Sequence, residues 1–175
     1  MRLALRPHPD TPSEAVSRID VEATRRGRDL VLAYEVFGDI TALVLAPPGP
    51  PERTDELWRT TCFEAFVGRV GDDGYAEFNL APSTRWAAYR FTGYREGMAD
   101  LAIETPRIAL TPGEGRLVVA ATVTVPLEGD WRLGLTAVIE EASGRKSYWA
   151  LAHAPGRPDF HQAAGFAAIL PPTEL

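Results

Sequence analysis

Apolar and polar residues alternate along most of this chain in short runs. Residues 19–24 read IDVEAT, and after the polar stretch RRGRD the run LVLAYEVFG resumes at residue 30. Successive side chains of a β-strand point to opposite faces, so runs of this period have one buried and one exposed face. The two runs therefore predict an opening β-hairpin.

Further runs of the same character follow, separated by turn residues. They are ITALVLAP (40–47), TTCFEAFVGRV (60–70), YAEFNLAP (75–82), WAAYRFTGY (86–94), RIALTP (107–112), GRLVVAATVTVPL (115–127), WRLGLTAVIEEA (131–142) and KSYWALAH (146–153). The 15 glycines and 15 prolines fall mostly between the runs, as expected for an all-β chain. The segment 118–125 is rich in β-branched residues and predicts a central strand that is buried on at least one side.

The pattern predicts an all-β fold, an antiparallel β-sandwich of about nine or ten strands with little helix. A length of 175 residues suits one domain over residues 1–175, and no repeat or linker indicates a second. The first 14 residues, which include His8, are expected to be a mobile segment outside the sandwich.

Composition narrows the possible partners. The net charge of −6 opposes phosphate, so nucleic acid is not an expected partner, and the short basic cluster of Arg25, Arg26 and Arg28 is expected at a solvated hairpin tip. The N-terminus lacks the apolar core of a signal peptide, and no stretch is long enough to span a bilayer. With the single cysteine, Cys62, these features predict a cytoplasmic protein with no membrane partner. We further expect a monomer or a weak homodimer.

Several residues could carry chemistry, although the chain has none of the familiar catalytic motifs. Glu64 and Glu77 lie on neighbouring predicted strands and could approach one another as an acid/base pair. Cys62 sits within a strand and is expected to be an inert core residue. His153, Asp159 and His161 could form a metal site if their loop folds back, or they could hydrogen-bond the loop and fix its shape.

Aromatic residues beside polar ones indicate a ligand site. An aromatic ring stacks on the apolar face of a sugar, while carboxylate, amide and guanidinium groups bind the hydroxyls. Trp58 follows a proline-rich loop and is the best candidate for such a platform, whereas Trp131 and Trp149 are expected to cap the core. Arg59, Arg85, Arg90 and Arg95 could instead bind an anion. They could equally lie on solvated strand faces.

The segments ELWRTTCFEAFVG, YAEFNLAPSTRWAAYRFTGYREGM, LTAVIEE and SYWALAH with PDFH resemble DOMON-like bacterial proteins related to family 9 carbohydrate-binding modules. The resemblance covers about residues 15–170. It implies a β-sandwich with a sugar-binding or haem-binding role.

The resemblance also implies which residues bind. In the sugar-binding modules a loop tryptophan is followed six residues later by a carboxylate, and Trp58 with Glu64 repeats that spacing. Glu77 and Asn79 occupy the place of a polar pair on the next strand, although the modules typically have a basic residue where this chain has Glu77. Trp149, or the loop from His153 to His161, stands where the modules have a second tryptophan. The haem-binding relatives use methionine and histidine, for which the candidates are Met98 and the two late histidines.

The leading hypothesis is a non-catalytic module that binds a sugar or another small polar ligand and needs no cofactor. The predicted ligand-binding residues are Trp58, Glu64, Glu77, Asn79, Arg90 and Trp149. The alternatives are a hydrolase or lyase that uses Glu64 and Glu77, a haem-binding or metal-binding domain, and a protein-interaction module.

Overall fold

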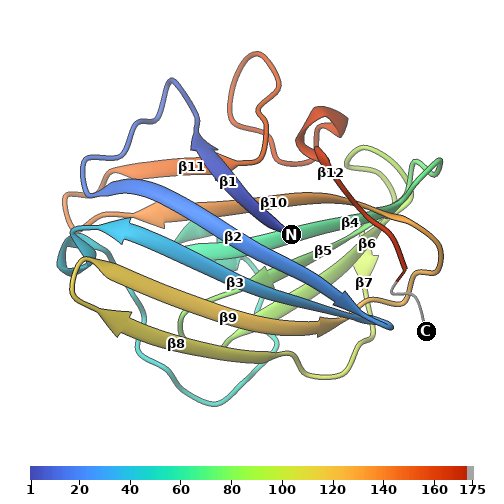
Figure 1. Cartoon of the computed structure of the whole chain (residues 1–175), viewed down its shortest axis with the longest axis horizontal. Coiled ribbons are helices and arrows are strands. Elements are labelled where there is room, and N and C mark those ends of the chain that lie inside the picture. Colours follow the sequence, from blue (N-terminus) through green and yellow to red (C-terminus); the bar gives the residue numbers. More distant parts are fainter. Residues whose placement is uncertain (173–175) are drawn as a thin grey trace.

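Two antiparallel sheets packed face to face make up the protein. The computed structural model of the chain describes residues 1–172 (Figure 1). The first sheet consists of β1 (Arg2–Pro7), β2 (Val16–Arg26), β3 (Asp29–Gly38), β9 (Arg116–Thr124) and β8 (Arg107–Gly113). The second sheet consists of β7 (Ala99–Asp100), β6 (Trp86–Phe91), β5 (Tyr75–Leu80), β4 (Cys62–Arg69), β10 (Trp131–Glu140), β11 (Lys146–Ala150) and β12 (Ala168–Leu170). The predicted all-β antiparallel sandwich is confirmed.

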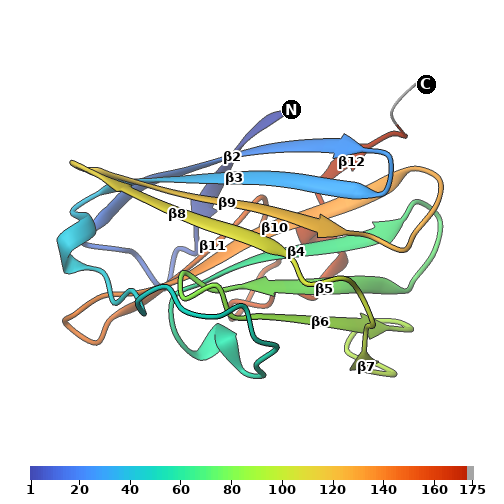
Figure 2. The same ribbon diagram turned by 90° about the horizontal axis from the view of Figure 1, so that it is seen from below.

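The first strand joins the two sheets. Arg2 to Leu5 of β1 pair with β2 of the first sheet, and Arg6 and Pro7 pair with β11 of the second. Figure 2 shows the layers edge-on, with β2, β3, β9 and β8 in one and β4, β5, β6 and β7 in the other. The expectation of a mobile N-terminal segment is therefore wrong: Leu5 is buried in the core and His8 is 2% exposed.

The core lies between the sheets and follows from the alternation in the sequence. On β9 every second residue from Leu117 to Val123 is buried, as the run at 118–125 predicted, and β3 alternates in the same way. These side chains pack against Phe63 and Phe78 of the second sheet. Trp131 is fully buried and its indole N–H donates to Leu127 O at 3.0 Å, which matches its expected role.

Two details differ from the predictions. Residues 40–47 form no strand, because Asp39 caps a short 3-10 helix, Ile40–Ala42, and only Leu43 makes a bridge, to Glu141. Arg25 is more than part of a solvated tip: its guanidinium lies 3.7 Å from the centre of the Trp131 ring and donates to Gly129 O. Among residues 1–172, no helix has the length and apolar character needed to cross a membrane.

The second sheet is buried on both faces, which creates the setting for a site. All but the last residue of β4 and every residue of β5 are buried. The outer face is covered by the segment around a second 3-10 helix (Leu57–Arg59) and by the loop before a third (Ala163–Gly165). Polar side chains on that face are therefore enclosed.

Candidate ligand-binding site

Strand register brings a set of polar side chains together on the outer face of the second sheet. Glu64 on β4 lies opposite Asn79 on β5 and Thr136 on β10. Glu77 lies two pairs further along β5, opposite Phe66, so the two glutamates are diagonal neighbours on one face of the hairpin. The prediction that they could approach one another agrees with this register.

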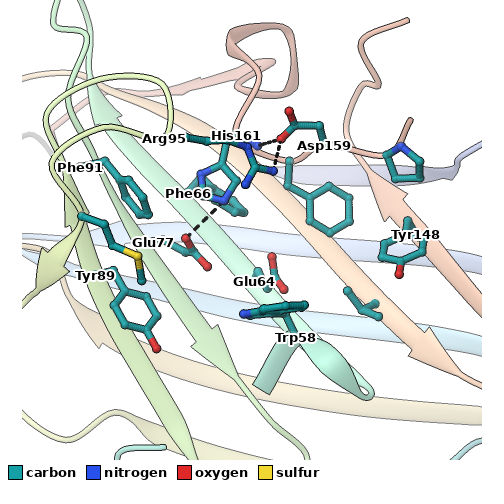
Figure 3. A pocket seen from close by; sticks show the side chains of 14 residues that line it. Trp58, Glu64, Phe66, Glu77, Tyr89, Phe91, Arg95, Tyr148, Asp159 and His161 are labelled. Atoms are coloured by element: carbon teal, nitrogen blue, oxygen red, sulfur yellow. Dashed lines mark hydrogen bonds and ion pairs between the residues drawn. The ribbon is translucent and has the colours of Figure 1, made fainter. Parts of the chain in front are cut away.

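Glu64 and Glu77 line a cavity of about 430 Å³. Figure 3 shows both carboxylates inside it, between Trp58 on one side and His161 on the other. The lining residues are Trp58, Glu64, Phe66, Glu77, Tyr89, Phe91, Arg95, Met98, Val138, Tyr148, Pro158, Asp159, Phe160 and His161. Aromatic walls around two buried acids are the composition expected of a site for a small ligand.

Glu64 is the most deeply enclosed acid of the cavity, with only 2% of the residue exposed. Its backbone carbonyl accepts a hydrogen bond from Tyr34 Oη at 2.7 Å, which ties this point of β4 to the first sheet. Thr136 Oγ1 donates to Glu64 Oε2 at 3.3 Å, whereas Oε1 has no partner among the described residues. Burial raises the pKa of the Glu64 carboxyl well above its ordinary value, and the nearby Glu77 raises it further.

Glu77 is held by a neighbour on its own strand. Asn79 Nδ2 donates to Glu77 Oε1 at 3.0 Å, while Asn79 Oδ1 has no partner among residues 1–172. Burial raises the pKa of Glu77 to about 7, against the opposing effects of the Asn79 hydrogen bond and the Arg95 charge. Glu77 therefore keeps its proton up to about pH 7.

His161 faces Glu77 in its neutral form. Burial and the Arg95 charge lower the pKa of His161 to about 4. Tyr75 Oη accepts from the Arg95 amide at 3.3 Å and lies 2.7 Å from His161 Nδ1, so the tyrosine proton is directed to Nδ1. The imidazole proton is then on Nε2, which lies 3.7 Å from Glu77 Oε2.

A clasp between two loops closes this side of the cavity. Arg95 Nη2 lies 2.8 Å from Asp159 Oδ1, Tyr94 Oη donates to Asp159 Oδ2, and the His161 amide donates to Asp159 Oδ1. Although burial acts to raise it, these hydrogen bonds lower the pKa of Asp159 to about 2. Arg95 has a φ of 55°, an unfavourable conformation for a residue other than glycine, which the clasp helps to hold.

Trp58 forms the opposite side of the cavity and is 48% exposed. It lies in the short helix that follows Glu56, whose φ is 60°. Tyr89 Oη donates to Asp55 Oδ1 at 2.6 Å, which ties the chain just before the Trp58 helix to β6. A half-exposed indole beside buried polar groups has the geometry of a stacking platform.

The structure separates the six predicted ligand-binding residues into two groups. Trp58, Glu64 and Glu77 line the cavity, and Asn79 is hydrogen-bonded to Glu77 without lining it. Arg90 points from the face of β6 opposite to that of Tyr89, because neighbours on a strand alternate.

Trp149 is 2% exposed and lies in the core between the sheets, where its indole donates to Ser147 Oγ at 2.9 Å. It cannot reach the cavity from that position, so we assign neither Trp149 nor Arg90 to the site. Cys62 is fully buried, as predicted.

The weaker metal and haem candidates are not brought together. His153 Nε2 lies 2.8 Å from Arg6 O and its ring contacts His8, while Asp159 and His161 belong to the cavity. Across residues 1–172, no three His, Cys, Asp or Glu side chains are gathered as a metal ion would require. Met98 does line the cavity, but both ring nitrogens of His161 already face protein groups, which does not fit an axial haem ligand.

Several functional residues were not singled out from the sequence. Phe66, Phe91, Tyr148 and Phe160 line the cavity. Phe66 follows Glu64 by two residues and Phe91 follows Tyr89 by two, so alternation places each pair on one face. Sequence alone does not say which face is enclosed, because both faces of β4 and β5 are apolar enough to be buried.

Comparison with known proteins places the fold. No family model matches the sequence, and no curated protein matches it either. A solved structure of a proposed carbohydrate-binding protein from Bacteroides uniformis has a TM-score of 0.67 at 19% identity, covering 98% of this chain and 85% of that one.

Two further neighbours are structures of a family 9 carbohydrate-binding module from Caldicellulosiruptor kristjanssonii. The complex with cellotriose has a TM-score of 0.56 at 12% identity, covering 89% of this chain and 74% of the module. The complex with glucose has a TM-score of 0.53 at 11% identity, covering 93% and 78%. The protein has the antiparallel β-sandwich fold of family 9 carbohydrate-binding modules.

Proposed function

We propose that this protein is a non-catalytic module that binds a small carbohydrate in the cavity between Trp58 and His161. The observation that carries the proposal is the pairing of a half-exposed indole with enclosed polar groups, Glu64, Glu77 and Asn79. A pyranose presents an apolar face and a rim of hydroxyls, and this arrangement offers a partner to each. The fold adds support, since two neighbours with it were solved with cellotriose and with glucose.

The proposal also covers the relatives, the cellular location and the oligomeric state of the protein. We place the chain among DOMON-like bacterial relatives of these modules. We expect it to act in the cytoplasm as a monomer or weak homodimer, on a soluble sugar.

Isothermal titration calorimetry with glucose and cellotriose tests the proposal. Trp58→Ala should lose about 2 kcal/mol or more of binding free energy if the ring is the anchor. The melting temperature should change little because Trp58 is half exposed. Ile169→Ala is the matched control, since Ile169 is 57% exposed on β12, outside the cavity lining. Equal binding by both variants would contradict the proposal, as would an absence of binding by the parent protein.

A second function is favoured by one specific observation. Glu64 and Glu77 are both buried carboxyls with raised pKa values, and Glu77 at about 7 is poised between its two protonation states. Paired acids of this kind serve as general acid and base in sugar hydrolysis. Release of chromophore from aryl glycosides by the parent protein, lost in both Glu64→Gln and Glu77→Gln, would establish a hydrolase. Turnover that persists in both variants would exclude these two residues.

A further inference from the structure

The cavity holds more acids than cations. Among its lining residues Glu64, Glu77 and Asp159 are acidic and Arg95 is basic. Arg95 is already paired with Asp159 at 2.8 Å, and His161 is neutral near pH 7. The field of Arg95 reaches Glu77, but burial outweighs it. Within the described part of the chain, the two glutamates therefore have no cation of their own.

The unpartnered atoms at this place are oxygens. Glu64 Oε1 and Asn79 Oδ1 have no hydrogen-bond partner among residues 1–172, although Glu64 is 2% and Asn79 0% exposed. Glu77 Oε2 is 3.7 Å from His161 Nε2, which is too long for a good hydrogen bond. Buried acceptors without donors are costly to fold, so Glu64 Oε1, whose residue lines the cavity, points to a ligand that supplies a donor.

A protonated amine matches these atoms better than a hydroxyl does. An ammonium group has three donors and no acceptor, and its positive charge stabilises the ionised form of a buried carboxyl group beside it. Trp58, Tyr89 and Tyr148 line the same cavity, as Figure 3 shows, and aromatic rings attract cations.

We propose that the ligand is an amino sugar whose protonated amine lies between Glu64 and Glu77. This inference rests on the proposed carbohydrate binding and names the sugar class. The ammonium group donates hydrogen bonds to the glutamate oxygens, while Trp58 stacks on the ring of the sugar.

Three sugars that differ at one position test the proposal. Glucosamine carries a charged amine where glucose has a hydroxyl and N-acetylglucosamine a neutral amide. In calorimetric titrations near pH 6.5, glucosamine should bind about tenfold tighter than either neutral sugar, the difference between a charge-assisted and a neutral hydrogen bond. The affinity for glucosamine should also rise from about pH 5 to about pH 7, as Glu77 loses its proton, while that for glucose should change little.

Glu77→Gln isolates the charge, because glutamine keeps the shape of the protonated acid and can still accept the Asn79 hydrogen bond. This variant should bind glucosamine no more tightly than glucose. Glu22→Gln is the matched control, since Glu22 is an exposed carboxylate of β2 in the other sheet, and this variant should keep the preference. Thermal unfolding of each variant shows whether it is folded.

The outcomes separate the two proposals. Glucose binding equal to glucosamine binding overturns the amine and leaves the carbohydrate proposal standing. Methylammonium that raises the melting temperature, while all three sugars have no effect, supports the amine site and overturns carbohydrate binding. No response to any of these four probes overturns both.

Discussion

Replacing Glu77 by glutamine should remove a large pH dependence from the stability of this protein. The pKa of Glu77 is about 7 in the fold and 4.5 at its ordinary value, so the folded state binds more protons between these two pH values. Stability then falls as the pH rises through this range. Since each pH unit between two pKa values corresponds to about 1.4 kcal/mol, the ionised carboxylate costs about 3 kcal/mol above about pH 7.

His161 acts in the opposite direction over the same range. Its pKa is lowered from 6.5 to about 4, so it is neutral in the fold while the unfolded chain still binds a proton. Its contribution therefore rises with pH, and the profile of the parent protein alone shows only the balance. The difference between Glu77→Gln and the parent isolates the carboxyl group.

Urea unfolding followed by tryptophan fluorescence measures that difference. Below about pH 4.5 the two proteins should be about equally stable, since glutamine can still accept the Asn79 hydrogen bond. Above about pH 7 the variant should be more stable by up to about 3 kcal/mol. Parallel profiles of parent and variant from pH 4.5 to 8 would refute the reasoning. A variant that is less stable than the parent above about pH 7 would refute it too.

Further predictions concern the groups that hold the site in place. Tyr34→Phe should cost about 1–3 kcal/mol in urea unfolding, because the buried carbonyl of Glu64 loses its donor. Phe78→Ala should cost about 3–5 kcal/mol in the same assay, since Phe78 is fully buried between the sheets, and a loss below about 1 kcal/mol would contradict that packing. Asp159→Asn should weaken the clasp with Arg95 and lower sugar affinity in calorimetry, with thermal unfolding showing that the variant is folded; unchanged affinity would exclude a role for the clasp.

The sequence indicated many of the residues that form the site, but not how they are arranged in space. The sequence indicated that Glu64 and Glu77 lie on neighbouring strands, and the register of β4 and β5 decided that Asn79 lies opposite Glu64. Trp58 was found because it follows a proline-rich loop. For Trp149 the sequence left two interpretations, a cap of the core and a ligand-binding residue, because a tryptophan beside polar residues can face either way; in the structure it lies in the core.

The sequence by itself determined the fold class and the position of most strands. Period-two alternation and the placing of glycine and proline are local signals, and they suffice to mark strands and turns. The first strand, β1, was not predicted, because it joins the two sheets and no local sequence pattern indicates such a connection. The stretch at 40–47 was misread because side-chain capping by Asp39 overrides its strand-like composition.

Only the tertiary structure decided which face of the second sheet is enclosed, and with it the chemistry of the site. Glu64 and Glu77 look like ordinary strand carboxylates in the sequence. Their pKa values rise because a loop some 80 residues later along the chain, with Asp159 and His161, covers them and excludes water. Desolvation depends on what lies above a side chain in space, so it emerges only when distant segments meet.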